Sequence, residues 1–133
     1  MDGDTNRLKY VVAHLLVAFL GYYNSSLKRL IFQVNKMLIL NHSFEGPYRI
    51  GKKLIDRAAI YVILTSTNRV IDVGQSGETG TRLLKHDRKN CWSRNNGTHF
   101  VVKWMPSDTY TKEDREKLEK VIRNKYNPTC GKI

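Results

Sequence analysis

Residues 58–74 read AAIYVILTSTNRVIDVG, and their pattern is the strongest indication of the fold. Its first eight residues are mostly β-branched or aromatic, which is typical of a buried strand. Ser-Thr-Asn at positions 66–68 favours a turn, and residues 69–73 return to apolar character. Two such runs joined by a short polar turn predict a β-hairpin. Tyr61 lies on its first strand, and Asp72 and Gly74 lie at the end of its second.

The segments after this hairpin predict a helix, a strand and a second helix. Residues 74–80 form a glycine-rich loop, and a helix is expected over residues 81–89. Residues 98–105 alternate as a third strand, and Thr111 with Asp114 forms a capping box for a helix that runs to about residue 125. The predicted fold class is α+β: a small three-stranded antiparallel sheet flanked by helices, in the order β-β-α-β-α.

The first third of the chain predicts a helical hairpin. One apolar helix is expected over residues 7–22, and a second begins near residues 24–26 and carries apolar residues every three or four positions as far as Leu38. Residues 41–57 hold Gly and Pro and are expected to be a connector. The predicted domains are therefore an N-terminal helical extension, residues 1–43, and a second domain, residues 44–133.

The role expected for this extension is packing or dimerisation. The apolar run at residues 10–23 is too short for a membrane-spanning helix, so the sequence favours a buried helix and no membrane association. An exposed hairpin that contacts a membrane or a partner protein is the alternative.

Charge points to a polyanionic partner. The 133 residues suffice for one domain with a core, and they hold 23 Lys and Arg against 12 Asp and Glu, a net charge of +11. Residues 51–133 hold 17 of these cations against 9 acidic residues. A small basic domain of this kind most often meets nucleic acid, although a merely solvated basic surface is the simpler reading.

The cysteine count favours a reducing compartment. Cys91 and Cys130 are the two cysteines. They are too few for a structural zinc site without histidine partners, and a single disulfide is compatible with the sequence but not indicated by it. A reduced cytoplasmic protein with buried thiols is therefore the expectation.

Four side chains supply the chemistry that phosphodiester cleavage needs. Tyr61 on the first strand is a candidate for orienting or deprotonating water. Arg82 and His86 lie four residues apart on one helix face, where the arginine suits a phosphate and the histidine a proton relay or a contact to Tyr61. Glu119 on the last helix is a hard carboxylate suited to Mg²⁺. Each has an ordinary alternative: a core tyrosine, a solvated helix face, and a surface glutamate no different from Glu113 or Glu116.

Taken together, the order and spacing of these residues resemble the GIY-YIG nuclease family. Residues 59–61 (Ala-Ile-Tyr) match its first motif and residues 72–74 (Asp-Val-Gly) its second, over a little more than half the chain. The resemblance implies an endonuclease that depends on Mg²⁺ or Mn²⁺ and acts on DNA, with RNA as the alternative. It also implies roles for three residues: Tyr61 activates water, Arg82 stabilises the phosphate, and Glu119 binds the metal.

The chain departs from the family pattern at three positions. Ala59 replaces a glycine, Asp72 replaces the second motif tyrosine, and Gly131 stands near the place of a terminal asparagine. A bacterial branch of the family resembles this chain at four segments, namely residues 71–74, 86–88, 91–92 and 130–132. Asp72 is then a trait of that branch, and we expect its carboxylate to lie in the cleft as a metal contact or base.

Basic residues near the second motif are candidates for holding the duplex. The first candidates are Lys85, Arg88, Lys89 and Arg94, with Lys52, Lys53 and Arg69 adding to the same face. Trp92 and Trp104 are core residues or platforms for bases. A catalytically inactive nucleic-acid-binding module on the same fold is the alternative function. Cutting two strands with one such site requires a dimer or sequential nicking.

Overall fold

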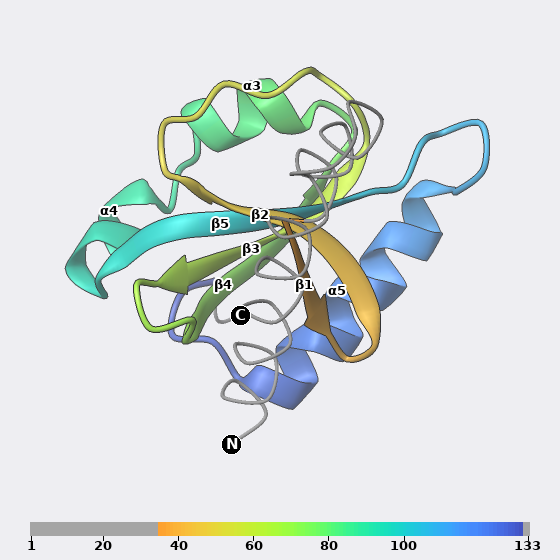
Figure 1. The fold of residues 1–133 in the computed structure, drawn as a ribbon. Helices are drawn as coiled ribbons and strands as arrows, with labels where there is room; N and C mark the ends of the chain where they lie inside the picture. The colour runs from red at the N-terminus through yellow and green to blue at the C-terminus, as the bar shows by residue number, and fades with distance from the viewer. Residues whose placement is uncertain (1–34, 132–133) are drawn as a thin grey trace, which may run out of the picture.

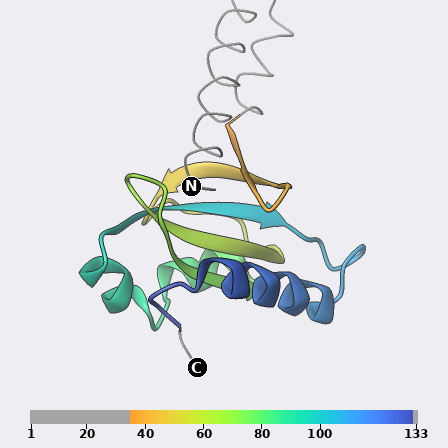
Figure 2. The same cartoon turned by 90° about the horizontal axis from the view of Figure 1, so that it is seen from below.

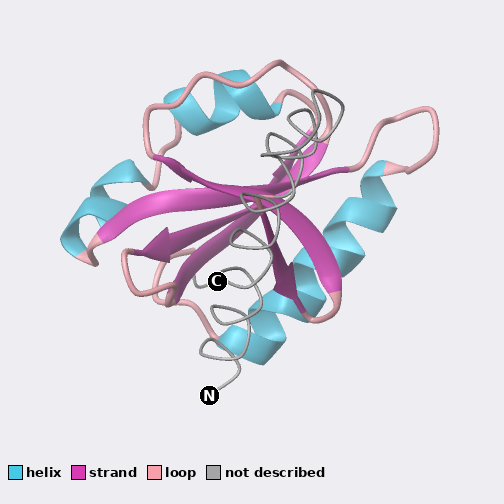
Figure 3. Ribbon diagram, in the orientation of Figure 1, coloured by secondary structure: helices cyan, strands magenta, loops and turns pink. Residues whose placement is uncertain are grey.

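A five-stranded antiparallel sheet forms the centre of the molecule (Figure 1). The structure is a computed structural model that describes residues 35–131. The strands are β1 (Lys36–Ile39), β2 (His42–Arg49), β3 (Ala59–Thr65), β4 (Val70–Ser76) and β5 (Gly97–Trp104), in the spatial order β1-β2-β5-β3-β4. Three helices accompany them: α3 (Thr79–Leu84), α4 (Lys89–Arg94) and α5 (Lys112–Tyr126). The fold class is α+β as predicted, but the prediction of three strands was wrong (Figure 3).

The two additional strands come from residues assigned to the helical extension and the connector. Met37 and Ile39 on β1 and Phe44 on β2 are all buried, and β1 pairs with β2 in antiparallel register. Leu40 and Asn41 connect them with positive φ angles of 49° and 66°, as a two-residue hairpin turn requires. Strand β1 therefore replaces the end of the predicted second helix, and the sheet includes residues on both sides of the predicted boundary at residue 44. The remainder of the predicted helical hairpin lies outside the described residues.

The central strands bury both faces. On β3, Ile60, Val62 and Leu64 pack into one cluster with Val73, Val101 and Ile122, whereas Tyr61 and Ile63 pack into another with Leu83 and Trp92. Because side chains alternate along a strand, β3 separates the cluster under α5 from the cluster under α3 and α4. In Figure 2, α5 runs along the β3–β4 side of the sheet, with β1 and β2 at the far side. The prediction of a buried strand here is confirmed.

The helices differ from the prediction in one respect. The helix expected over residues 81–89 is shorter than predicted, because α3 ends at Leu84, and a second short helix that was not predicted, α4, begins at Lys89. Helix α5 begins with the predicted capping box, in which the Thr111 hydroxyl accepts from the Asp114 backbone and the Asp114 carboxylate accepts from the Thr111 backbone. It ends at Asn127, which adopts the left-handed conformation.

The C-terminal tail returns to the sheet. The backbone N–H of Cys130 donates to the carbonyl of Ile71 at 2.9 Å, on the outer side of the edge strand β4. The Arg123 guanidinium donates to the carbonyl of Val73 on the same strand. No helix among the described residues combines the length and apolarity that crossing a membrane requires.

Candidate active site

Tyr61 is placed by the pairing of the two motif strands. It lies opposite Gly74 in the β3–β4 register, and both residues are buried. A Cβ atom at position 74 would lie 2.3 Å from the Tyr61 hydroxyl oxygen and from the adjacent ring carbon. The glycine of the second motif therefore provides the space that the phenol ring occupies.

His86 lies in the break between α3 and α4 and contacts the phenol directly. Its Nε2 atom is 2.7 Å from the Tyr61 hydroxyl, and its Nδ1 atom accepts from the backbone N–H of Arg88 at 3.0 Å. Asp87 Oδ1 is also 3.3 Å from Nδ1, but an ion pair there would require a proton on Nδ1. Since the Arg88 amide can only donate, Nδ1 carries the lone pair and Nε2 carries the proton. In this tautomer, the imidazole donates to the Tyr61 oxygen.

Burial keeps both members of this pair neutral. Burial and, to a smaller extent, the nearby Arg82 and Arg88 cations together lower the pKa of His86 to about 4. Burial also raises the pKa of Tyr61 to about 12, although the same two arginines oppose that shift. With its pKa raised in this way, the Tyr61 phenol is protonated at neutral pH. It can act as a general base only if additional positive charge near the phenol oxygen lowers that pKa.

Arg82 lies beside Tyr61 and reaches solvent. Its guanidinium donates to the Asp87 carboxylate at 2.9 Å, and its side chain is 40% exposed. Because an exposed ion pair is weak, Arg82 can exchange Asp87 for a phosphate at small cost. Helix α3 thus presents an available cation next to the Tyr61–His86 pair.

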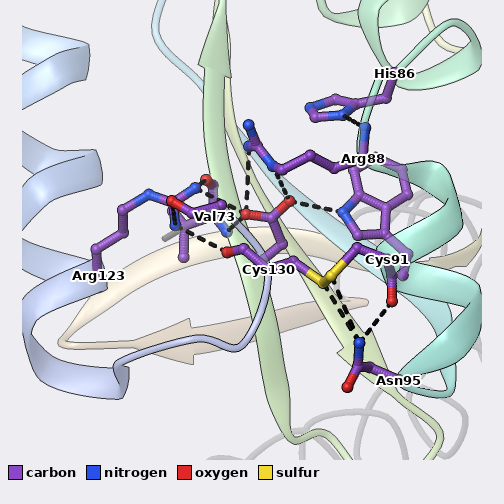
Figure 4. The surroundings of a disulfide bond; sticks show 10 residues. Val73, His86, Arg88, Cys91, Asn95, Arg123 and Cys130 are labelled. Atoms are coloured by element: carbon purple, nitrogen blue, oxygen red, sulfur yellow. Dashed lines mark hydrogen bonds and ion pairs between the residues drawn. A yellow bond between two sulfur atoms is a disulfide. The ribbon is translucent and has the colours of Figure 1, made fainter. Parts of the chain in front are cut away.

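Asp72 does not have the role expected from the sequence. Its carboxylate is fully buried and accepts five hydrogen bonds, from the Val73 amide, from Arg88 twice, from Trp92 Nε1 and from Arg123 (Figure 4). A carboxylate offers about four lone-pair positions, so none remains for a metal ion or for accepting a proton from water. The structure assigns Asp72 to binding two arginines, and the expectation of a metal contact or base at this position is not supported.

Arg123 is the residue that the sequence analysis missed. From α5 it donates to Asp72 at 2.8 Å, to the carbonyls of Cys130 and Gly131 at 3.1 and 3.2 Å, and to Glu119 at 3.3 Å. It therefore joins the second motif, the C-terminal tail and the predicted metal ligand. An arginine one turn after Glu119 on the same helix face was the available signal.

Glu119 is half-buried next to this network. Its side chain is 24% exposed, and burial raises its pKa although Arg123 and Arg88 oppose the shift. Among the described residues, one oxygen accepts from Arg123 and the other accepts no hydrogen bond. No cluster of three or more metal-ligating side chains occurs in residues 35–131, so a metal here would have at most two such ligands from these residues. This donor set fits Mg²⁺, which keeps most of its waters.

Cys91 and Cys130 form a disulfide between α4 and the C-terminal tail, with an S–S distance of 2.07 Å (Figure 4). The expectation of reduced thiols was therefore wrong in this structure. The Asn95 amide donates to the Cys91 carbonyl at 2.8 Å, beside the bond. The pairing holds the tail that carries two of the acceptors of Arg123.

The predicted nucleic-acid ligands divide into two groups. Lys85 and Arg94 are exposed. Arg88 is instead engaged with Asp72, and the Lys89 ammonium donates to the Leu84 carbonyl at 3.0 Å at the end of α3. The tryptophans are structural, because Trp92 is buried on Asp72 and Trp104 donates to Glu45 at 3.0 Å. The structure thus brings Tyr61, Arg82, His86 and Glu119 around the Asp72 network and leaves two of the four cations available.

No family model, curated protein or solved structure matches the chain.

Proposed function

We propose that the chain is a divalent-metal-dependent endonuclease that hydrolyses phosphodiester bonds in DNA. The observation that carries the proposal is the buried hydrogen bond between Tyr61 and His86, with the partly exposed Arg82 guanidinium beside it. A neutral imidazole that donates to a phenol oxygen favours its anionic form, and an adjacent arginine favours it further. The same arginine can bind the scissile phosphate and balance charge that develops in the transition state.

Glu119 is the residue that would hold the metal. A bound Mg²⁺ or Mn²⁺ supplies Lewis acidity for the phosphate and for the leaving oxygen. The chain's own residues have the remaining tasks. Arg82 binds and orients the phosphate, His86 holds the phenol through Nε2–H, and Arg123 orients the carboxylate of Glu119.

A specific observation favours a second candidate, a nucleic-acid-binding module without catalysis. Tyr61 is only 1% exposed, and its pKa is raised to about 12. With Asp72 fully occupied by its donors, the position of the second motif tyrosine supplies no further reactive group. In this alternative, the site residues bind the phosphate backbone and leave it intact.

Nicking of a supercoiled plasmid in Mg²⁺ or Mn²⁺ separates the two candidates. We expect metal-dependent nicking by the wild type, loss of nicking in Glu119→Ala and Arg82→Ala, and retention in the controls Glu116→Ala and Lys117→Ala. Glu116 and Lys117 are exposed residues of α5, and neither is a candidate contact for nucleic acid or metal. Absence of nicking by the wild type, with DNA binding that survives chelation and weakens as salt rises, would establish the binding module instead.

A further inference from the structure

The loop that joins β2 to β3, residues 50–57, combines exposed cations with an exposed aliphatic side chain. Lys52, Lys53 and Arg57 are exposed, and in the described part of the chain their side chains form no hydrogen bond or ion pair. Ile55 lies between them and is 56% exposed. The only other large hydrophobic residue exposed within residues 35–131 is Val121 on α5, at 53%. A single exposed aliphatic residue is ordinary, so the significance of Ile55 depends on the residues around it.

This loop is held firmly against α3. The Asp56 carboxylate accepts from the backbone N–H and the hydroxyl of Thr81 at 2.6 and 2.7 Å, and these bonds lower the pKa of Asp56. The Thr79 amide donates to the Arg57 carbonyl at 3.1 Å. At Gly80, an added Cβ would lie 2.1 Å from the Leu54 carbonyl oxygen, so the glycine permits the close approach. The loop therefore presents its side chains without having to be ordered on binding.

The position of the loop relates it to the candidate active site. It arches over α3 (Figure 1), and α3 carries Arg82. Lys85 follows Thr81 by four residues, so it continues the face of the helix on which the loop rests. The cations of the loop and of α3 thus lie on two adjoining segments. A surface that contacts several successive phosphates of a nucleic-acid backbone requires cations spread in this way.

We infer that residues 50–57 form a second DNA contact, in which Lys52, Lys53 and Arg57 bind phosphates and Ile55 inserts as an apolar wedge into the minor groove of a duplex. Proteins that bind the minor groove frequently insert an apolar side chain between base steps, which partly unstacks the bases and bends the duplex. This inference rests on the proposed function and specifies its substrate as a deformable duplex. An anionic membrane surface would also attract such a loop. The loop, however, adjoins α3, whose Arg82 lies beside the Tyr61–His86 pair, and binding to a lipid surface would give that pair no role.

The test compares Ile55→Ala with Val121→Ala, because both variants remove an equally exposed aliphatic side chain. Both are made in a Glu119→Ala background to prevent cleavage. The probe is a duplex of about 30 base pairs with a central TA step, the most easily kinked class of step, and with fluorescent aminopurine beside it. We expect Ile55→Ala to weaken binding about tenfold and to remove the rise in aminopurine fluorescence, whereas Val121→Ala does neither. Replacing Lys52 and Lys53 with Ala should lower the salt dependence of binding by about two counterions.

Three outcomes would overturn the inference. If the wild type nicks plasmid DNA but Ile55→Ala binds and perturbs the probe as Val121→Ala does, the wedge is wrong and the proposed function stands. If the wild type neither nicks nor binds DNA, both fail. If Ile55→Ala reduces sedimentation with phosphatidylglycerol vesicles but leaves DNA binding unchanged, the loop is a membrane contact.

Discussion

Replacing Asp72 with Asn tests whether this carboxylate is structural. The substitution keeps the shape of the side chain but exchanges one oxygen for an NH₂ group. The less damaging orientation places that group where Oδ2 now accepts from Arg88 Nε at 2.8 Å and Trp92 Nε1 at 2.6 Å. The N–H groups of Arg88 and Trp92 then face another donor, the new NH₂ group. Arg88 and Arg123 also lose the negatively charged carboxylate with which both form ion pairs.

The expected cost is a large share of the stability of the domain. Leaving a buried donor without an acceptor costs about 1–3 kcal/mol, and breaking a buried ion pair from one side costs about 3–5 kcal/mol. These contributions overlap, so we expect Asp72→Asn to lower the free energy of unfolding by about 4 kcal/mol. Domains are typically stable by about 5–15 kcal/mol, so the variant should fold in the cold but unfold at low denaturant.

Urea denaturation, followed by tryptophan fluorescence and circular dichroism, measures this loss. Asp108→Asn is the matched control, because Asp108 is an exposed loop carboxylate, and it should change stability by less than about 0.5 kcal/mol. An Asp72→Asn protein within about 1 kcal/mol of the wild type would refute the structural role derived from the five hydrogen bonds. Loss of metal affinity without loss of stability would restore the role expected from the sequence.

Three further perturbations follow from the structure. Gly74→Ala should cost about 1–3 kcal/mol of unfolding free energy, because its methyl group would overlap the Tyr61 hydroxyl. Gly77→Ala is its control in urea denaturation, since a Cβ there meets only an ordinary contact at 3.9 Å, and equal losses would contradict the overlap. Reducing the disulfide should cost about 4 kcal/mol, because it closes a loop with a sequence separation of 39; an unchanged urea midpoint in reductant would contradict this. The pKa of His86, lowered to about 4 from 6.5, means that the unfolded chain takes up a proton first as the pH falls below 6.5. Stability should therefore decline by at most about 3 kcal/mol between pH 6.5 and 4, and a His86→Gln variant with the same decline would exclude this histidine as the cause.

The central hairpin was predictable because local and tertiary preferences agree there. The strand run at residues 59–65 is buried on both faces, and the capping box at Thr111 is a local hydrogen-bonding pattern that packing leaves intact. Strand β1 was not found, because Met37 and Leu38 extend the three-and-four spacing of the preceding residues. The decisive signal was the alternation of Met37 and Ile39, followed by Asn41 in a tight turn.

The candidate site was predictable as a set of residues but not as a network. Tyr61 and His86 are 25 residues apart and meet at 2.7 Å, which the strand and helix assignments allowed. The occupation of Asp72 depends on Arg123, which approaches from a helix 51 residues away. Sequence periodicity shows which face of α5 is apolar, but it does not show which arginine reaches across to a buried carboxylate.

The return of the tail along β4 has a consequence for how the protein behaves in crowded solution. An edge strand with unpaired backbone groups is a template for pairing with another chain. Here Ile71 and Val73 already accept from Cys130 and Arg123 of the same molecule, so two of those acceptors are unavailable to a neighbour. The tail and Arg123 therefore cover part of the β4 edge, and chains that lose the tail or its disulfide should be the first to associate strand to strand.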